Sequence, residues 1–279
     1  MPPLSVIIPA HNEEAHLPAC LDALRLQNLG DLDGTPQIIL AANACTDGTL
    51  AVAEAARAGL ERAGWTLTCL DLAKPGKLNA LNAAETQATG RILVYLDADV
   101  RCAPDMMHQL SGALAPDRPL YASGQLVVAP ARSWITRHFA RVWSQLPFMT
   151  TNVQGAGLFA VSRAGRARWD RFPDIIADDG FVRLQFAPDE RIKVDATYHW
   201  PMVEGFANLV KTRRRQDAGV RELAALYPQL MRNESKPPMT GADHLRLLRR
   251  MPLSYLVYVG VMLAVKAKRG AHTEWTRGR

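Results

Sequence analysis

Two carboxylates stand one residue apart at the end of a strongly apolar run. Residues 92–96 are all apolar and lead directly into Asp97, Ala98 and Asp99. If the chain stays extended there, Asp97 and Asp99 point to the same face, because strand side chains alternate. Neighbouring carboxylates repel unless a cation lies between them, and hard oxygen ligands suit Mg²⁺ or Mn²⁺ holding a substrate phosphate. The alternative is a solvated turn after a strand, because short motifs often match by chance.

A second acidic pair, Asp178 and Asp179, precedes Gly180 at the start of a predicted helix, residues 180–186. A positioned carboxylate can accept the proton of an attacking hydroxyl group. An acid in this place can equally be a helix cap that interacts favourably with the helix dipole. The pattern alone leaves both interpretations open.

The first hundred residues alternate between strand and helix patterns. Strands are predicted at 5–9, 37–41, 65–70 and 92–96, with helices between them that end near 28, 64 and 88. Such alternation predicts a parallel sheet with right-handed crossovers, whose ligand-binding loops share one edge. That edge would carry Asn12, Glu13, Asn43, Lys77, Asp97 and Asp99. The absence of G-x-G-x-x-G and of G-x-x-x-x-G-K-[ST] argues against a dinucleotide-binding Rossmann enzyme and a P-loop NTPase.

The second half of the chain adds further elements. Helices are predicted at 104–115, 134–148 and 204–226, and strands at 121–129, 159–162 and 193–200. A turn containing Gly155 and Gly157 allows a ligand to approach the backbone, although a plain turn or bulge explains the same glycines. The pair Pro237-Pro238 interrupts the chain before the last helices.

Charge is distributed unevenly along the 279 residues, whose net charge is +6. Residues 211–279 hold 15 Lys and Arg against 5 Asp and Glu, so the carboxyl-terminal part is strongly basic. A basic part of this kind favours an anionic partner, or is simply a soluble surface. The four cysteines lack C-x-x-C spacing and predict reduced thiols, and the amino terminus does not resemble a signal peptide.

One segment, Met251 to Val265, contains 15 uncharged residues between basic flanks that include Arg250, Lys266 and Lys268. As a helix it would measure about 22 Å, which is short of a hydrocarbon core of about 30 Å. The pattern predicts either a helix lying on an anionic membrane surface or one that packs against the body of the protein.

Five segments, in the same order along the chain, resemble motifs of the inverting, nucleotide-sugar-dependent glycosyltransferases of the family-2 type. They are the opening strand and turn at 5–14, a counterpart of D-G-S-T-D-G-T at 43–49, G-K-x-x-A-L-N at 76–82, D-x-D at 97–99 and a counterpart of E-D-x-x-L at 177–182. The resemblance covers residues 4–219. It implies the α/β GT-A fold, with a Rossmann-like, mostly parallel central sheet flanked by helices and a helical carboxyl-terminal extension.

The resemblance also implies a domain organisation. Residues 1–219 would form the glycosyltransferase domain, with a nucleotide-binding half at about 1–103 and an acceptor and catalytic half at 104–219. Residues 220–279 would be a basic helical extension that either contacts the membrane or packs against the body of the protein.

The resemblance implies a role for each matching residue. Donor binding would involve Pro9, Ala10, Asn12, Glu13, Asn43, Lys77, Asp97, Gly155 and Arg215. Asp99, with Asp97, would hold Mg²⁺ or Mn²⁺. Asp179 would be the catalytic base, supported by Asp178. Because Asn43 stands where the family usually has a base-contacting Asp, the preference for uracil over other bases is left open.

Two further positions qualify the resemblance. The Q-x-x-R-W motif of processive synthases is reduced here to Thr212, Arg215 and Gln216, which favours transfer of a single sugar. The three consecutive arginines Arg213, Arg214 and Arg215 would close over the diphosphate or form a solvated face. His199 is either a third metal ligand or a packed residue beside Trp200.

The predicted function is inverting transfer of one sugar from a nucleotide-diphosphate sugar, with a UDP-sugar as the expected donor. The acceptor would be a hydroxyl of a lipid-linked or cell-envelope glycan, and the location the cytoplasm at the inner face of the plasma membrane. No nucleic acid partner is predicted. One alternative is a sugar-1-phosphate nucleotidyltransferase. Such an enzyme needs a Gly-rich loop with basic residues near its amino terminus, and this sequence has none there. The other, a non-catalytic nucleotide-sugar-binding module, is disfavoured by Asp97, Asp99 and Asp179.

Overall fold

The computed structural model describes residues 3–267. The chain divides into two compact units. The first unit comprises Met1–Leu126, Gly155–Asp174 and Gln185–Trp200, and the second comprises Val127–Gln154, Ile175–Leu184 and Pro201–Arg279. The chain passes between the units several times. The domain boundaries inferred from the sequence stay a prediction.

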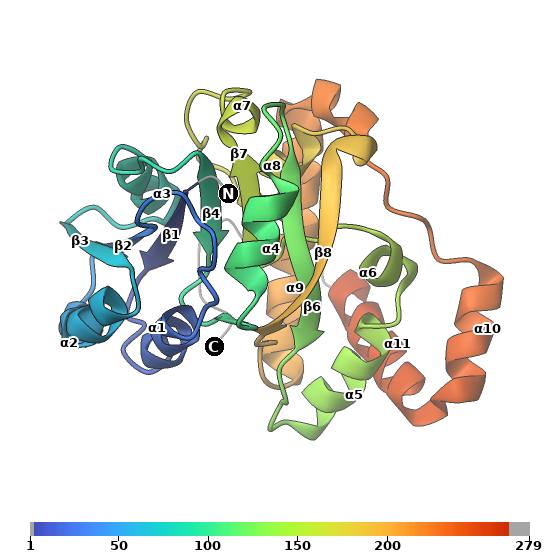
Figure 1. The fold of residues 1–279 in the computed structure, drawn as a ribbon. Coiled ribbons are helices and arrows are strands. Elements are labelled where there is room, and N and C mark those ends of the chain that lie inside the picture. Colours follow the sequence, from blue (N-terminus) through green and yellow to red (C-terminus); the bar gives the residue numbers. More distant parts are fainter. Residues whose placement is uncertain (1–2, 268–279) are drawn as a thin grey trace. The chain divides into compact units, whose positions relative to one another are not determined.

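An eight-stranded sheet, in the order β3-β2-β1-β4-β7-β6-β8-β5, organises the first unit (Figure 1). Strands β1 (Leu4–Ala10), β2 (Gln37–Asn43), β3 (Thr66–Leu72) and β4 (Ile92–Leu96) are parallel, as the sequence predicts. Because β1 lies between β2 and β4, the chain reverses its direction across the sheet at β1. Ligands bind at such a reversal, beyond the carboxyl ends of the strands.

The remaining strands make the sheet mixed rather than parallel throughout. They are β5 (Arg101–Cys102), β6 (Tyr121–Val128), β7 (Leu158–Ser162) and β8 (Arg191–Trp200). Antiparallel pairs join β4 to β7, β6 to β7 and β5 to β8. The sheet thus has a parallel half that carries the predicted donor loops and an antiparallel half that follows it.

Helices cover the sheet because their apolar faces match its core. Helix α1 (Leu17–Arg25) buries Leu17, Leu21 and Leu24 on one face, the side chains that the 3.6-residue period brings together. The other helices of this unit are α2 (Thr49–Arg62), α3 (Lys77–Glu85), α4 (Met106–Ala113) and α7 (Arg163–Arg166), with the 3₁₀ turn η1 (Pro188–Glu190). All five residues of β4 are buried, which fixes the end of that strand, and so Asp97, relative to the core.

The four cysteines are free thiols, as predicted. Burial raises the pKa of the Cys102 thiol to about 12 and raises that of Cys20 as well, so neither is a thiolate near neutral pH. They behave as small apolar core residues.

The second unit is mainly helical. It contains α5 (Trp134–Trp143), α6 (Pro147–Thr151), α8 (Asp178–Leu184), α9 (Phe206–Leu226), the 3₁₀ turn η2 (Pro228–Asn233), α10 (Gly241–Arg250) and α11 (Pro252–Ala267). The prediction of one helix over 134–148 is wrong, because α5 ends at Trp143 and Pro147 begins α6. Leu146 is extended (φ −66°, ψ 144°), since proline disfavours the helical conformation of the residue before it.

Helix α11 packs against α5 and α9 through one of its faces. Tyr258 lies 5.3 Å from Phe139 between ring centroids, and the hydroxyl of Ser254 lies 2.8 Å from Nδ1 of His138. Packing against the body, one of the two predicted alternatives, is therefore confirmed for this face. Within residues 3–267 no helix combines the length and the apolar character needed to cross a membrane. The predicted basic flank at Lys268 lies outside the described residues.

Candidate active site

The loops that follow β1 and β2 are held together by hydrogen bonds. Oδ1 of Asn12 accepts from the backbone N–H of Thr46 at 2.7 Å, and the N–H of Glu13 donates to Oγ1 of Thr49 at 2.7 Å. Asn12 (φ 53°) and Ala44 (φ 47°) adopt the left-handed conformation that residues with a Cβ rarely take. Such strain persists where the surroundings fix it, and it concentrates at functional sites.

Asp47 lies in the loop just before helix α2, and its side chain joins the same two loops. Its carboxylate accepts from the N–H of Thr49 at 3.1 Å, from Oγ1 of Thr49 at 2.5 Å and from the N–H of Glu14 at 3.2 Å. Burial works to raise the pKa of Asp47, but these hydrogen bonds outweigh it and lower the pKa. Asp47 and Thr49 were not predicted as site residues. Their D-x-T spacing, which allows a side chain to bond to the backbone two residues on, was the available signal.

Asn43 lies at the end of β2 and is only 2% exposed. Its Nδ2 donates to the carbonyl of Ala10 at 2.7 Å, and its Oδ1 accepts from the N–H of Gly76 at 3.0 Å. The side chain therefore connects the end of β1 to the loop before α3. A base contact by Asn43 stays a prediction, but the structure assigns both polar atoms a backbone partner. The side chain of Ala10 is in the core, so its predicted role would fall to its backbone.

Lys77 and Asp97 form an ion pair at this edge of the sheet. Gly76 has φ 122°, a conformation that suits glycine, and it places Lys77 at the first position of α3. Nζ of Lys77 lies 3.0 Å from Oδ1 of Asp97, and the two side chains are 29% and 34% exposed. A diphosphate would compete for Lys77, and a divalent cation would compete for Asp97, because each is a stronger ionic partner than a half-exposed side chain.

Asp97 and Asp99 lie in a turn rather than in an extended strand. Strand β4 ends at Leu96, and the N–H of Val100 donates to the carbonyl of Asp97 at 3.1 Å. The expectation that strand alternation directs both carboxylates to one face is therefore wrong. Their separation in sequence is unchanged, and both side chains are half-buried.

The chemistry of these residues fits Mg²⁺ or Mn²⁺. Such ions commonly bind to proteins through one or two carboxylates, and substrate phosphates and water complete the coordination. Among the described residues no cluster of three or more His, Cys, Asp or Glu side chains is arranged to hold a metal. His199, the third ligand considered above, thus belongs to no such cluster. Asp97 and Asp99 would hold the ion only together with the diphosphate.

Gly155 and Gly157 have positive φ values of 72° and 74°. A Cβ built at Gly155 would lie 1.8 Å from Oη of Tyr121, and one at Gly157 would lie 2.6 Å from Cδ1 of Trp200. Packing inside the first unit therefore accounts for both glycines. The carbonyl of Gly157 accepts from the N–H of Asp97 at 2.8 Å, which ties this loop to the acidic turn. Contact of Gly155 with a ligand stays a prediction.

The second acidic pair begins α8 in the second unit. Asp178 is 8% exposed, whereas Asp179 is half-buried, so Asp179 is the more accessible of the two. The N–H of Ile176 donates to Oε2 of Glu222 on α9 at 2.8 Å. A Cβ at Gly219 would lie 2.9 Å from Ile176, so this glycine allows the segment before α8 to lie close against α9. The start of α8 is thereby fixed.

Three consecutive arginines on α9 have different surroundings. Arg213 donates to Asp217 at 3.0 Å, and Arg214 donates to the carbonyl of Ala264 at 2.6 Å. These two arginines are held by contacts inside the second unit. Arg215, the predicted donor-binding residue, is half-buried, and its role stays a prediction.

A buried ion pair in the second unit was not predicted. Arg183 on α8 is 4% exposed, and its Nη2 lies 2.7 Å from Oε2 of Glu234. No motif marked these residues, since the ion pair joins two residues that are 51 positions apart in the sequence.

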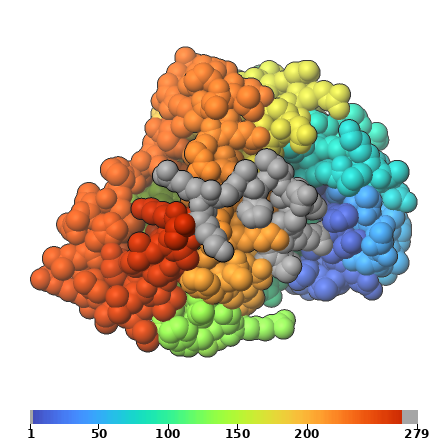
Figure 2. All heavy atoms as spheres, turned by 180° about the vertical axis from the view of Figure 1, so that it is seen from behind, coloured from blue at the N-terminus to red at the C-terminus, as the bar shows by residue number. Residues whose placement is uncertain are grey.

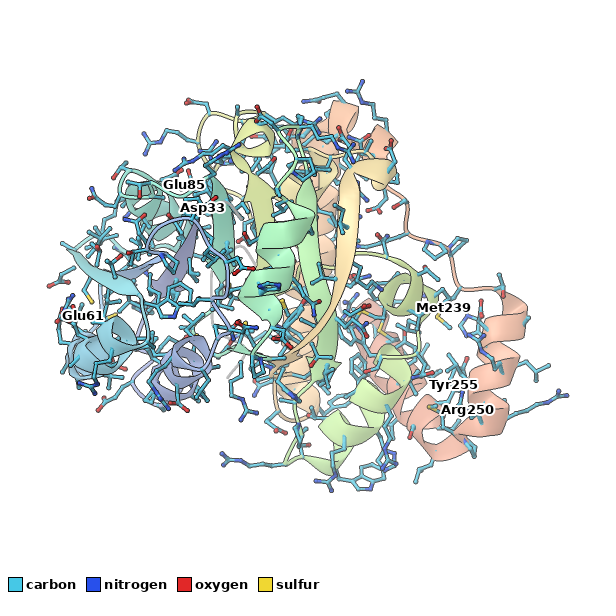
Figure 3. All side chains as sticks on the ribbon, viewed as in Figure 1. Asp33, Glu61, Glu85, Met239, Arg250 and Tyr255 are labelled. Carbon is cyan, nitrogen blue, oxygen red and sulfur yellow. The ribbon has the colours of Figure 1, made fainter. Side chains whose placement is uncertain are left out.

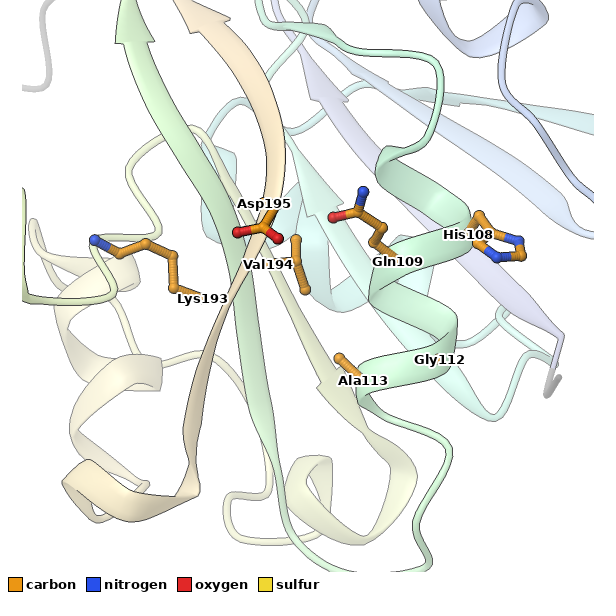
Figure 4. A pocket seen from close by; sticks show the side chains of 7 residues that line it. All are labelled: His108, Gln109, Gly112, Ala113, Lys193, Val194 and Asp195. Carbon is orange, nitrogen blue, oxygen red and sulfur yellow. The ribbon is translucent and has the colours of Figure 1, made fainter.

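A groove of about 430 Å³ lies between α4 and the first part of β8 (Figure 4). It is lined by His108, Gln109, Gly112, Ala113, Lys193, Val194 and Asp195. None of the residues predicted to bind donor, metal or acceptor is among them. The groove is therefore separate from the candidate active site.

Comparison with known proteins agrees with this arrangement. Curated relatives include a "PGL/p-HBAD biosynthesis glycosyltransferase" from Mycobacterium bovis and one from Mycobacterium tuberculosis, each 36% identical over 98 residues. That match covers 35% of this chain and 36% of the length of each relative.

Solved structures share the fold at low sequence identity. A mannosyltransferase, PcManGT from Pyrobaculum calidifontis in complex with GDP-Man and Mn²⁺, is 23% identical with a TM-score of 0.59, covering 97% of this chain and 76% of that one. TarS 1-349 from S. aureus in complex with UDP-GlcNAc is 15% identical with a TM-score of 0.55, covering 94% and 81%. These likenesses confirm the GT-A fold.

The family model described as "Glycosyl transferase family 2" matches residues 5–170, which is more than half of the chain. The matched region includes the four loops at the carboxyl edge of the parallel strands and the turn that holds Asp97 and Asp99. On this match, the chain belongs to glycosyl transferase family 2.

Proposed function

We propose that this protein is an inverting glycosyltransferase that moves one sugar from a nucleotide-diphosphate sugar to a hydroxyl acceptor. The observation that carries the proposal is the ion pair between Lys77 and Asp97, at 3.0 Å, two residues before Asp99. It lies where open α/β sheets bind ligands. A diphosphate needs a cationic side chain that can leave its present partner, as Lys77 can. The metal ion needs nearby carboxylates, which Asp97 and Asp99 supply.

The leaving nucleoside diphosphate gains negative charge as its bond to the sugar breaks. Lys77 would bind a phosphate oxygen as a point charge, and release from Asp97 would free it to do so. Asp97 and Asp99 would hold Mg²⁺ or Mn²⁺, which neutralises the same developing charge when bound. PcManGT is a mannosyltransferase in complex with GDP-Man and Mn²⁺, and its likeness to this chain supports metal use and a nucleotide-sugar donor.

Asp179 is the proposed general base. Its carboxylate would take the proton of the acceptor hydroxyl while that oxygen attacks the anomeric carbon. The bond to the diphosphate breaks on the opposite side, so the anomeric configuration inverts. Buried Asp178 would support it at the fixed start of α8.

The acceptor is proposed to be a lipid-linked or cell-envelope glycan, and the site of action the cytoplasm at the inner face of the plasma membrane. The basic carboxyl-terminal part of the chain supports an anionic surface as partner. A UDP-sugar is the proposed donor.

The first test replaces the proposed base. Asp179→Asn should keep donor binding and lower transfer by roughly 10²- to 10⁴-fold, the usual contribution of general base catalysis. Asp189→Asn, which neutralises an exposed acid in the first turn of η1, is the matched control and should transfer normally. Normal turnover by the Asp179 variant would show that another group is the base.

The second test concerns the metal and the donor. UDP-, GDP- and dTDP-sugars are screened for Mn²⁺-dependent thermal stabilisation, because a ligand that binds the folded state raises its melting temperature. Asp99→Ala should remove the metal-dependent part of donor binding in calorimetry. If Mn²⁺ has no effect on donor binding by the unmodified protein, the metal assignment to Asp97 and Asp99 fails.

A further inference from the structure

Helix α11 has an exposed apolar stripe opposite the face that packs. Leu253, Leu256 and Leu263 are 52%, 62% and 61% exposed. Their spacing of three and seven residues places them on one side of the helix. Ser254, Tyr258, Val261 and Val265 are buried on the other side. The helix thus presents apolar side chains both inward and outward, which a helix on an ordinary soluble surface does not need to do.

Helix α10 packs against α11 and carries exposed leucines of its own. Leu245 and Leu248 are 47% and 39% exposed. The hydroxyl of Tyr255 on α11 lies 2.7 Å from Nδ1 of His244 on α10, which attaches the two helices. Figure 3 labels Tyr255 on α11 and Arg250 at the end of α10. The Oγ1 of Thr240 accepts from the N–H of Asp243, and the carboxylate of Asp243 accepts in return from Thr240, so α10 begins with a capping box. Both helices lie at the surface in Figure 2.

Exposed cations accompany these leucines. Arg246, Arg249, Arg250 and Lys266 are exposed, and Arg246 is partly balanced by Asp243 at 2.9 Å. Residues 235–267 contain five Lys and Arg but one acid. We call the five exposed leucines and these four cations the α10–α11 surface. Its composition is that of a helix pair that lies in a membrane interface, with apolar chains inserted and cations at the headgroups.

We propose that the α10–α11 surface docks this enzyme onto an anionic lipid bilayer. Charge complementarity favours this occupant, because juxtamembrane basic residues are attracted to anionic headgroups. A second copy of the chain would bring four cations against four cations across a symmetric contact, which charge repulsion disfavours. The inference rests on the membrane location proposed above and identifies the elements responsible for it. It does not depend on the transfer reaction.

The test is sedimentation of the full chain with vesicles of phosphatidylcholine, with and without phosphatidylglycerol. Binding should need the anionic lipid and fall as salt rises. Arg249→Gln with Arg250→Gln should weaken binding by about fivefold for each charge. Leu253→Ser, Leu256→Ser and Leu263→Ser together should weaken it by roughly tenfold for each leucine.

Matched controls carry the same changes elsewhere. Leu26→Ser with Leu226→Ser alters leucines that are 54% and 58% exposed, and Arg62→Gln with Arg91→Gln removes two exposed charges. Both controls should bind vesicles like the unmodified protein. Circular dichroism and donor binding in solution verify that each variant is folded. The arginine variant alters only exposed side chains, so it tests the surface even if the leucine variant unfolds.

Three outcomes would overturn the inference. The unmodified protein stays in the supernatant with anionic vesicles at low salt, or the α10–α11 variants bind as well as the controls. Alternatively, the protein self-associates without binding vesicles and the leucine variant becomes monomeric, which would identify a second copy as the occupant. Donor binding is measured separately. Vesicle binding without donor binding would refute the proposed transfer reaction and leave this surface standing. Donor binding without vesicle binding would refute this surface and the proposed membrane location, and leave the transfer reaction standing.

Discussion

Replacing Asn43 by Asp separates a structural role from a base-reading role at this position. Asn43 donates from Nδ2 to the carbonyl of Ala10 at 2.7 Å and accepts from the N–H of Gly76 at 3.0 Å. Asn43→Asp keeps the shape and the second contact. At the first contact the Nδ2 donor becomes an oxygen. That oxygen and the carbonyl oxygen of Ala10 then face each other without a hydrogen bond, at a position that is 2% exposed.

The size of the effect follows from that lost donor. A buried carbonyl left without its partner costs about 1–3 kcal/mol, and an ionised carboxylate beside it adds to the cost. We expect the free energy of unfolding to fall by about 2–4 kcal/mol at neutral pH on this basis. Asn43→Ala should lose about 1–3 kcal/mol, because it leaves the partners at Ala10 and Gly76 unsatisfied.

The pH dependence gives a second signature. A protonated carboxyl group can donate to the Ala10 carbonyl, so burial and this contact raise the folded-state pKa of the introduced group. A raised pKa makes the folded state relatively more stable below the unfolded-state value of about 3.9. The loss of stability in Asn43→Asp should therefore be small near pH 4 and should grow as the pH rises toward the folded-state pKa.

Urea unfolding at several pH values measures these differences. Asn79→Asp is the matched control, since Nδ2 of Asn79 donates to the carbonyl of Lys74 at 3.2 Å in an exposed place where water can replace it. It should change stability by no more than about 0.5 kcal/mol. The reasoning is wrong if Asn43→Asp is as stable as the unmodified protein at neutral pH and binds UDP more tightly. That result would mean that Asn43 reads the base.

Three further substitutions test other parts of the structure. Gly155→Ala should lower the free energy of unfolding by about 3 kcal/mol or more, because the new Cβ meets Tyr121 Oη at 1.8 Å and φ is 72°. At Gly241 no described atom lies within 4 Å of an added Cβ, so Gly241→Ala should be neutral or stabilising in the same urea unfolding assay. Glu234→Gln should cost about 2–4 kcal/mol, since it leaves the Arg183 charge buried. Burial works to raise the pKa of Glu234, but Arg183 outweighs it and lowers the pKa, so this stabilisation is present above about pH 4.3 and is lost as the pH falls through the lower folded-state value. Similar unfolding of variant and unmodified protein across that range would contradict the pair's role.

The first half of the fold was predictable because its signals are local. Apolar runs such as residues 92–96 alternate with amphipathic helices, and this pattern determines parallel pairing with few alternatives. The order β3-β2-β1-β4 follows the same rules. The second half was less predictable, because hydrophobic periodicity gives a strand's faces but not its partner or direction. The antiparallel pairing of β4 with β7 joins residues far apart in sequence, and no local pattern marks it.

The candidate site shows the same division. Residue types and order were enough to identify Lys77 and Asp97, which the structure brings to 3.0 Å. The turn at Asp97 and Asp99 was not predicted, because strand alternation was extended past the last hydrogen-bonded residue of β4, Leu96. The contacts of Asn43 depend on burial and on the partners Ala10 and Gly76, and these are properties of three loops together rather than of any one motif.

These contacts of Asn43 bear on how the donor is selected. If the Ala10 carbonyl and the Gly76 N–H occupy this side chain when a donor is bound, it has little capacity left to recognise a nucleobase. Asn12, Glu13 and the backbone of the loops after β1 and β2 would then contact the base. These loops are held in a fixed geometry, so they would select a base by its shape more than by its pattern of donors and acceptors. Discrimination between bases should accordingly be weak, because strong discrimination needs a buried polar group that the wrong base leaves unsatisfied. Comparable thermal stabilisation by UDP and GDP in the presence of Mn²⁺ is the expected result, so selection of the proposed UDP-sugar would depend on contacts to the sugar rather than to the base. A preference for UDP of 10⁴-fold or more, the range that a dedicated hydrogen-bonding contact can supply, would show that a polar group in this pocket reads uracil after all.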